Sequence, residues 1–305
     1  MSGHAPRQTG AEQTDRTAFV LSGGGSLGAL QVGMLKALTE NGIHPGLLIG
    51  SSVGAVNAAW MAGRPGHDGA RELGEIWLAL RRQDVFPFSP WSSARGLIGR
   101  TNHVISSASL RALLEKHIPY ERLEQAHIPV HIVTTELKTG RALALCSGPA
   151  VPALLASTAI PGVFPPVTIG RRALVDGGIA SHTPIAHAIE LGATRIYVLA
   201  VSYTWLNQEP THAFGMALHA LARFVEQRLE IDVQAHKGVA EIHVLPSVEL
   251  PIVSPADFSR SKELIERGYT STLRYLDAAP TPARARVAPT GNKQLNLNHS
   301  PVRAA

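Results

Sequence analysis

The sequence predicts an α/β fold built on a mostly parallel central sheet, and three observations support this prediction. Short apolar runs alternate with amphipathic stretches, as strands alternate with crossover helices in parallel sheets. The first two of these runs end directly in glycine-rich turns that open onto helical patterns. With 305 residues, of which 45% are hydrophobic and 17% charged, the chain is long and apolar enough to bury one large core.

The first sixty residues contain two strand–helix units. The apolar run 17–21 predicts a buried strand, and apolar residues at helical spacing follow from Leu27 until Gly42 ends the helix. A second strand is expected over 45–49 and a second helix over 53–61. Because both units run strand to helix, we expect right-handed crossovers between parallel strands.

The same alternation continues to residue 276. A helix over 70–81 has Leu73, Ile76, Trp77 and Leu80 on one face. Lys138-Thr139-Gly140 predicts the turn of a β-hairpin. Its two strands are expected over 128–137 and 141–146, with further strands over 173–175, 195–201 and 242–245, and further helices over 107–118, 150–158, 184–191, 213–233 and 256–276.

These elements predict one domain over residues 17–278. A polar extension, 1–16, precedes it, and a Pro- and Asn-rich tail, 279–305, is expected to be disordered. The single cysteine, Cys146, excludes an internal disulfide and a Cys-rich zinc site, and we expect neither a metal nor a cofactor. The extension lacks the apolar core of a secretory signal, and no apolar run is long enough to span a membrane, so we expect a cytoplasmic protein.

The net charge of +5 lies almost entirely in the tail. Arg284, Arg286, Lys293 and Arg303 give the tail +4, and the rest of the chain is close to neutral. A nearly neutral body predicts no nucleic-acid partner. Basic residues on a mobile end attract anionic lipid headgroups weakly, so peripheral contact with the inner membrane face is a hypothesis.

The first motif is Gly23-Gly24-Gly25-Ser26-Leu27-Gly28, between the first strand and the first helix. Glycines allow positive φ there, so backbone N–H groups can point outward at the positive end of the helix dipole and form an anion-binding nest. The spacing also matches the dinucleotide pattern G-x-G-x-x-G, which requires an acidic residue at the end of the next strand. That strand ends in Leu47-Leu48-Ile49-Gly50-Ser51-Ser52, with no acid, so we set the dinucleotide interpretation aside.

The second motif, Gly50-Ser51-Ser52-Val53-Gly54, matches G-x-S-x-G at a strand-to-helix turn. Such a turn exposes the hydroxyl of Ser52 at a helix N-terminus, and its flanking glycines leave room for a tight backbone. The short pattern alone is weak evidence, but its position after a strand strengthens it. The alternative is a pair of helix-capping serines.

The third motif, Asp176-Gly177-Gly178, follows the apolar strand 173–175. Functional groups of α/β sheets gather where strands end, so Asp176 is the candidate acid, with a turn-forming role as the alternative. Asp68-Gly69 follows no strand and is interpreted as a helix start. Two of the fourteen histidines, His182 and His187, follow the candidate acid without a distinctive local pattern.

Together these residues resemble the patatin-like phospholipase family. The likeness rests on the three motifs in this order, on Gly54-Ala55-Val56-Asn57-Ala58 after the serine, and on the stretch 156–167 before the aspartate. It covers about residues 17–278 and implies a three-layer α/β/α hydrolase. Leu27 stands where many members carry Arg or Lys, so a cationic side chain is missing there for contact with an oxyanion or phosphate.

The resemblance implies a dyad without histidine. Ser52 would attack an ester carbonyl, Asp176 would take its proton, and N–H groups of Gly23, Gly24 and Gly25 would hold the oxyanion. A carboxylate is a weak base, so the mechanism favours an Asp176 removed from water. The remaining motif glycines are Gly28, Gly50, Gly54, Gly177 and Gly178.

The expected function is therefore a serine lipid acyl hydrolase of phospholipase A, lysophospholipase or esterase type. It would cleave carboxylic esters of lipids or lipid-like molecules through an acyl-enzyme. Two alternatives remain: a non-catalytic lipid- or anion-binding module, and a Ser-His-Asp esterase of another fold that uses His182 or His187.

The segment 84–104 is unusually apolar for a loop and has two interpretations, which we weigh equally. It forms a lid or acyl-chain wall, or it is core beneath a long loop. Residues 203–206 have the same two interpretations, and for them we favour a place in the core. The apolar residues of 84–104 on which this rests are Phe86, Phe88, Trp91, Leu97 and Ile98.

Overall fold

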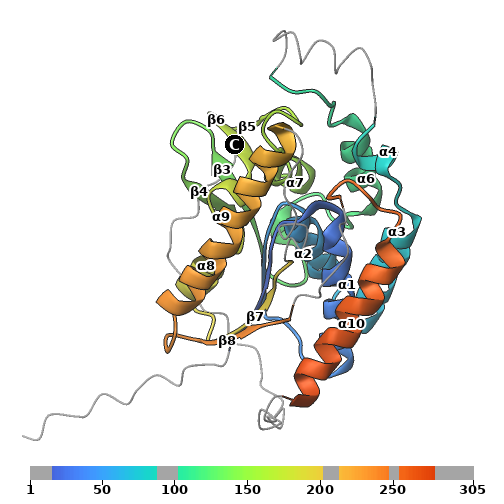
Figure 1. The fold of residues 1–305 in the computed structure, drawn as a ribbon, viewed down its shortest axis with the longest axis vertical. Coiled ribbons are helices and arrows are strands. Elements are labelled where there is room, and N and C mark those ends of the chain that lie inside the picture. The colour runs from blue at the N-terminus through green and yellow to red at the C-terminus, as the bar shows by residue number, and fades with distance from the viewer. Residues whose placement is uncertain (1–15, 88–101, 202–212, 247–253, 279–305) are drawn as a thin grey trace, which may run out of the picture.

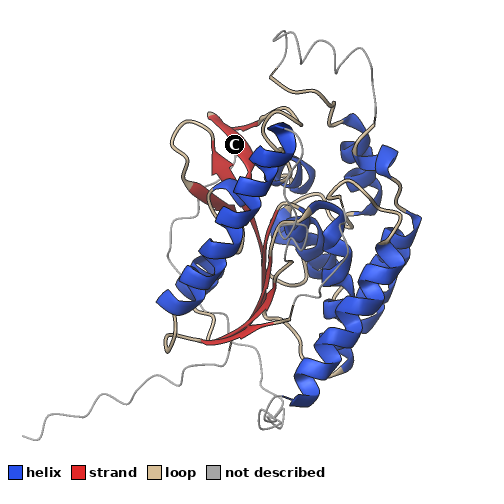
Figure 2. Cartoon of the chain, viewed as in Figure 1, coloured by secondary structure: helices blue, strands red, loops and turns tan. Residues whose placement is uncertain are grey.

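The structure is a computed structural model that describes residues 16–87, 102–201, 213–246 and 254–278. Its centre is one eight-stranded sheet (Figures 1 and 2). In chain order the strands are β1 (Thr17–Leu21), β2 (Leu47–Ser51), β3 (Val130–Glu136), β4 (Ala142–Leu145), β5 (Val167–Ile169), β6 (Arg172–Asp176), β7 (Arg195–Leu199) and β8 (Glu241–Val244).

The sheet is mixed. Its order is β5-β6-β3-β2-β1-β7-β8, with β4 also paired to β3. The predicted parallel arrangement is confirmed for β3, β2, β1, β7 and β8. The pairs β3–β4, β3–β6 and β5–β6 are antiparallel, and the pairing of β3 with β4 confirms the predicted hairpin. Only a short turn at Gly170 joins β5 to β6, and so short a connection allows only antiparallel pairing.

Helices cover both faces of the sheet and complete the three layers. On one face, α8 (Ile185–Glu190) and α9 (Ala213–Ala235) pack against Ala18 and Val20 of β1. The opposite face of β1, with Phe19 and Leu21, packs into the larger layer, which lies across the sheet from α8 and α9 (Figure 1). This larger layer contains α1 (Gly28–Glu40), α2 (Val53–Gly63), α3 (Gly66–Ala79), α4 (Arg82–Val85), α6 (Ala108–His117), α7 (Ala150–Ser157) and α10 (Ser261–Ala278).

Two glycines let α1 and α10 pack closely. A Cβ at Gly33 would overlap the backbone of α10 at Ile265, and a Cβ at Gly268 would overlap the backbone of α1 at Leu30. The last helix is thereby fixed against the helix that follows the first glycine-rich turn. Three 3₁₀ turns complete the described elements: η1 (Gly25–Leu27), η2 (Leu123–Gln125) and η3 (Gly177–Ile179).

Most predicted elements lie within a few residues of their expected bounds. Two helices begin elsewhere, and two short elements were not expected: β5, and α4 at 82–85, which runs into the segment 84–104 that was expected to be a loop. The last helix was expected from residue 256 but begins at Ser261, because the Asp257 side chain accepts hydrogen bonds from the N–H and hydroxyl of Ser259 and stabilises a turn instead. The helix expected from 70 begins at Gly66. Strand β5 was not expected, since it has three residues and follows two prolines.

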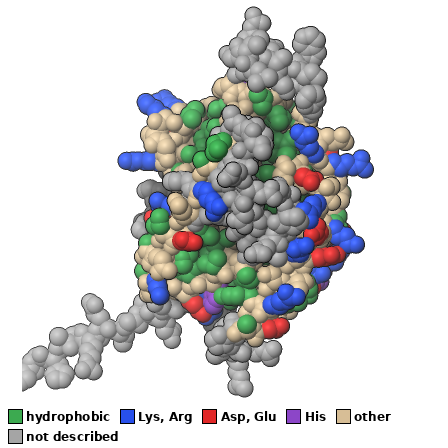
Figure 3. All heavy atoms as spheres, in the orientation of Figure 1, with side chains coloured by type: hydrophobic (Ala, Val, Ile, Leu, Met, Phe, Trp, Pro, Cys, Tyr) green, Lys and Arg blue, Asp and Glu red, His purple; other side chains and the backbone are tan. Residues whose placement is uncertain are grey.

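Several sequence predictions lie outside the described residues. They are the extension as far as residue 15, the middle of the apolar segment 84–104 (residues 88–101), residues 203–206, and the tail. None of the described helices is long and apolar enough to cross a membrane. On the face seen in Figure 3, acidic and basic side chains are interspersed among apolar ones. The described residues form surface ion pairs such as Arg71–Glu75 and Arg260–Glu263.

Candidate active site

Ser52 sits on a strained turn between β2 and α2. Its φ of 54° and ψ of −128° make it the one non-glycine residue with positive φ among those the structure describes. Gly50 and Gly54 allow the turn, because a Cβ at Gly50 would overlap the carbonyl of Gly54, and a Cβ at Gly54 would overlap the carbonyls of Leu21 and Ser22. Strain of this kind persists only where the surrounding structure enforces it, and it is typical of functional residues.

The hydroxyl of Ser52 donates a 2.6 Å hydrogen bond to Oδ2 of Asp176. The sheet brings these residues together across 124 positions of sequence. Strand β3 lies between their strands, with Ser51 opposite Val133 and Asp176 opposite Thr134. The predicted serine and carboxylate therefore meet at the edge of the sheet where β2 and β6 end.

Hydrogen bonds hold both the side chain and the backbone of Asp176 in place. Its Oδ1 accepts a hydrogen bond from the Gly178 N–H at 2.8 Å, and its backbone carbonyl accepts one from the Thr135 hydroxyl, also at 2.8 Å. Gly177 has no room for a side chain, because a Cβ there would overlap the Val133 carbonyl. Burial raises the pKa of Asp176 to about 6, against the lowering effect of the hydrogen bonds from Ser52 and Gly178.

Ser157, at the end of α7, is a site residue that the sequence analysis missed. Its Oγ accepts the backbone N–H of Ser52 at 2.9 Å and donates to the Val133 carbonyl at 2.6 Å. The side chain is fully buried and links the strained turn to β3. Ser157 lies in the stretch 156–167 that supported the family resemblance, but no local pattern distinguishes it from its neighbours.

The first glycine motif lies beside Ser52. A Cβ at Gly23 would lie 3.2 Å from the Ser52 Cβ, and Gly25 lines the same cavity as Ser52. Gly24 and Gly25 have φ of 156° and 58°, values that favour glycine. The N–H of Gly23 donates to the His182 carbonyl at 3.4 Å. Of the three predicted oxyanion donors, Gly23 thus already has a partner.

The two candidate histidines occupy different places. The His182 ring lies between the two glycine turns, within 3.1 Å of where a Cβ on either Gly23 or Gly178 would be. Burial lowers its pKa to about 4, so the imidazole is neutral near pH 7. His187 lies on α8, in the layer on the other face of the sheet. Among the described residues, no three His, Cys, Asp or Glu side chains are grouped to hold a metal ion.

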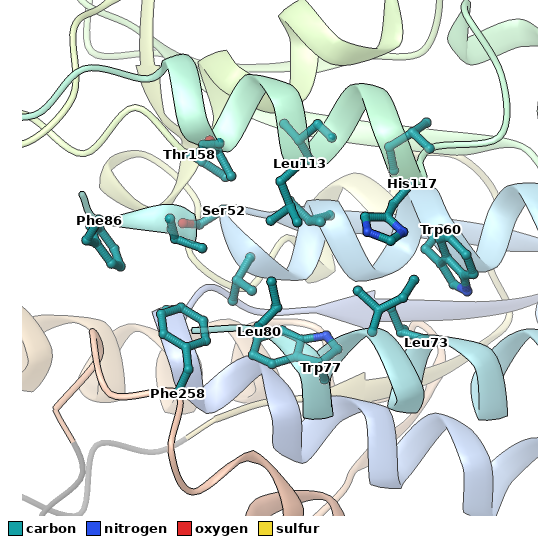
Figure 4. Close-up of a pocket in the computed structure, with 18 of the residues that line it drawn as sticks. Ser52, Trp60, Leu73, Trp77, Leu80, Phe86, Leu113, His117, Thr158 and Phe258 are labelled. Carbon is teal, nitrogen blue, oxygen red and sulfur yellow. The ribbon is translucent and has the colours of Figure 1, made fainter. Parts of the chain in front are cut away.

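A largely apolar cavity lined in part by Ser52 runs between α2, α3 and α6 (Figure 4). It has about 800 Å³ of space between protein atoms, its open mouth included. The face of α3 predicted from Leu73, Ile76, Trp77 and Leu80 lines it. Phe86, from the start of the apolar segment 84–104, also lines the cavity and stacks on Phe164 with ring centroids 5.5 Å apart.

Known proteins resemble this chain in sequence. Residues 19–189 match the family model described as patatin-like phospholipase. An uncharacterised NTE family protein of Mycobacterium tuberculosis is 32% identical over 179 residues, which are 56% of this chain and 45% of that protein. The lysophospholipase NTE1 of Cryptococcus neoformans var. neoformans is 32% identical over 193 residues, 60% of this chain and 11% of that protein. The chain therefore spans less than half the length of either relative.

Two solved structures align along most of the chain. VipD from Legionella pneumophila has a TM-score of 0.48 and 15% identity, over 87% of this chain and 67% of its own. Human GIVD cytosolic phospholipase A2 has a TM-score of 0.47 and 12% identity, over 89% of this chain and 60% of its own. Because the family model matches more than half of the residues, the chain belongs to the patatin-like phospholipase family.

Proposed function

We propose that this protein is a serine lipid acyl hydrolase that cleaves carboxylic esters with Ser52 and Asp176. The 2.6 Å hydrogen bond from the Ser52 hydroxyl to a buried carboxylate is the observation that carries the proposal. The apolar cavity lined in part by Ser52 supports a lipid-like acyl group as the part of the substrate bound there. Family membership supports the same reaction class.

The reaction follows from this geometry in two steps. Ser52 Oγ attacks the ester carbonyl as its proton passes to Asp176, and the carbonyl oxygen becomes an oxyanion. The N–H groups of Gly24 and Gly25, in the positive-φ turn beside Ser52, are the proposed oxyanion donors. Collapse of the intermediate releases the alcohol with the proton from Asp176 and leaves Ser52 acylated. Water then gives its proton to Asp176 and attacks the acyl-enzyme. Collapse of this second intermediate frees the fatty acid as Asp176 returns the proton to Ser52 Oγ.

The acidity of Asp176 suits both proton transfers. A general base works best when its pKa lies near the operating pH, and a pKa of about 6 approaches that condition more closely than an ordinary aspartate near about 3.9. Because the carboxylate binds Ser52 directly, the proposal needs no imidazole.

Labelling and hydrolysis with matched variants test the proposal. We expect a fluorophosphonate to label the wild type but not Ser52→Ala, and Asp176→Asn to lose ester hydrolysis. His187→Ala and Asp68→Asn should keep ester hydrolysis. Asp68 is the matched control for Asp176: both are followed by a glycine, but 86% of the Asp68 side chain is exposed to solvent. Absence of labelling in the folded wild type would favour a binding module, and a folded but inactive His182→Ala or His187→Ala would favour a Ser-His-Asp esterase. A panel of phospholipids, lysophospholipids, glycerides and thioesters then identifies the substrate class.

A further inference from the structure

We propose that the cavity at Ser52 is a slot of fixed length that admits an unbranched acyl chain of about ten carbons and ends at Trp60. This inference rests on the proposed function and adds a preference for medium-length acyl chains. It depends on the length of the slot, on its lining and on the way its far end is closed.

The length of the slot follows from α2. Val53, Val56 and Trp60 line the cavity from one face of the helix that begins directly after Ser52. Trp60 lies eight positions after Ser52, and an α-helix rises about 1.5 Å per residue, so the slot is about 12 Å long. Figure 4 shows Phe86 and Phe258 near the Ser52 end and Trp60, Leu73 and His117 at the other.

The length of the slot sets how many carbons of an extended acyl chain fit inside it. A fully extended backbone advances about 3.3–3.6 Å over three covalent bonds, or about 1.2 Å per bond. A saturated acyl chain has the same tetrahedral zigzag, so 12 Å accommodates about ten carbons. Carbons beyond the tenth would meet the indole of Trp60.

The lining favours hydrocarbon over polar chains. The indole N–H of Trp60 donates to the Gly69 carbonyl at 2.9 Å, and that of Trp77 donates to Asn57 Oδ1 at 3.0 Å. The hydroxyl of Thr158 likewise donates to the Leu154 carbonyl at 2.8 Å. These polar groups are thus occupied outside the slot, and the rings present carbon to its interior. Burial and the neighbouring charge of Lys116 also lower the pKa of His117, which favours its uncharged imidazole.

The far end of the slot is firmly built. Trp60 is 5% exposed and Leu73 is 3% exposed. The hydrogen bond to Gly69 fixes the indole of Trp60, and the guanidinium of Arg64 lies 5.0 Å from the ring centroid. The His117 ring meets Trp60 edge-on, with centroids 6.4 Å apart. A longer chain would have to displace a side chain that its neighbours hold from several sides.

A series of p-nitrophenyl esters from C4 to C16, at one constant concentration of neutral detergent, tests the slot. Each buried methylene contributes about 0.8 kcal/mol, or about fourfold in kcat/KM. We expect kcat/KM of the wild type to rise by up to this factor per carbon as far as about C10, and to stop rising or fall beyond it. An unbroken rise to C16 in the wild type would refute the slot.

Variants at the two positions along α2 move the limit in opposite directions. Trp60→Ala should raise the C14-to-C8 ratio of kcat/KM at least tenfold. Leu73→Ala, at the same end of the slot, should raise the ratio too and replaces Trp60→Ala in the test if that variant does not fold. Val56→Phe fills the slot about 6 Å from Ser52, so it should lower the C10-to-C4 ratio of kcat/KM at least tenfold. Leu78→Ala, on the exposed side of α3, is the control, with an unchanged profile.

The outcomes separate this inference from the proposed function. If Ser52→Ala hydrolyses the esters as the wild type does, the proposed function fails. If Ser52→Ala is inactive but folded Trp60→Ala and Val56→Phe keep the chain-length profile of the wild type, the slot fails and the proposed function stands.

Discussion

Replacing Asp176 by asparagine should abolish ester hydrolysis and stabilise the fold above pH 6. Burial raises the pKa of this carboxyl to about 6 from an ordinary value near about 3.9. Asparagine has nearly the same shape, and its side-chain oxygen can still accept the Gly178 N–H. It carries no charge, however, and cannot take the proton of Ser52. The substitution therefore removes the proton acceptor and the cost of burying its charge together, so activity should fall while stability rises.

The size of that cost follows from the pKa. A rise of about two pKa units corresponds to about 3 kcal/mol in favour of the protonated carboxyl in the folded protein. Between about pH 4 and pH 6, the folded protein holds a proton that the unfolded chain has released, so the free energy of unfolding falls as pH rises through this window. Above pH 6, the wild type bears the full penalty and Asp176→Asn bears none.

Unfolding experiments at several pH values measure this difference. The advantage of Asp176→Asn in free energy of unfolding should be small at pH 4 and reach about 3 kcal/mol at pH 7.5, which corresponds to about 6–12 °C in melting temperature. The exposed Asp68 provides the control, because Asp68→Asn removes a charge that water already surrounds. A difference between Asp176→Asn and the wild type that stays constant from pH 4 to pH 7.5 would refute the reasoning, because a buried charge must act through its titration.

Three further predictions concern the same edge of the sheet. The pH profile of kcat/KM should rise with an apparent pKa near 6 and then level off, because only ionised Asp176 accepts the serine proton; at pH 5 the rate should be about a tenth of its plateau. Ser157→Ala should lower kcat about fivefold with little change in KM, since it removes a hydrogen bond of about 1 kcal/mol to the Ser52 N–H and touches no substrate. An equal rise in KM would count against this role. Gly54→Ala should lower the melting temperature sharply, whereas Gly46→Ala, whose Cβ would meet only a carbonyl at 3.7 Å, should change it by a degree or two; similar melting temperatures for the two would contradict the crowding at the turn.

The strands and helices that carry the motifs were predictable because their signals are local. Thr17–Leu21 is a short apolar run followed by glycines, and β1 has these bounds. The antiparallel part of the sheet was less accessible. Strand β5 has only three residues, too few for their alternation to be distinctive, and its place beside β6 depends on the turn at Gly170 rather than on its own residues.

In the candidate site, too, local sequence signals identify some residues and miss others. Ser52 and Asp176 lie in recognisable turns, so the sequence could single out both, but not the hydrogen bond between them. Ser157 could not be found, because its role depends on β3 and on a partner 105 residues away. The apolar face of α3 was recognised from Leu73, Ile76, Trp77 and Leu80, yet such a pattern cannot distinguish a helix packed in the core from one that lines a cavity.

Burial also bears on the choice between a carboxylate and a histidine as the base. Removing a group from water disfavours its charged form, so the same environment raises the pKa of Asp176 to about 6 and lowers that of His182 to about 4. In water the imidazole is the stronger base, with a pKa of about 6.5 against about 3.9 for the carboxylate. At this sheet edge the order is reversed, and the stronger base is the one that Ser52 contacts. In the proposed reaction, the desolvation that costs stability at Asp176 therefore also makes its carboxylate a better base, and it makes His182 the weaker candidate although its ring lies close by.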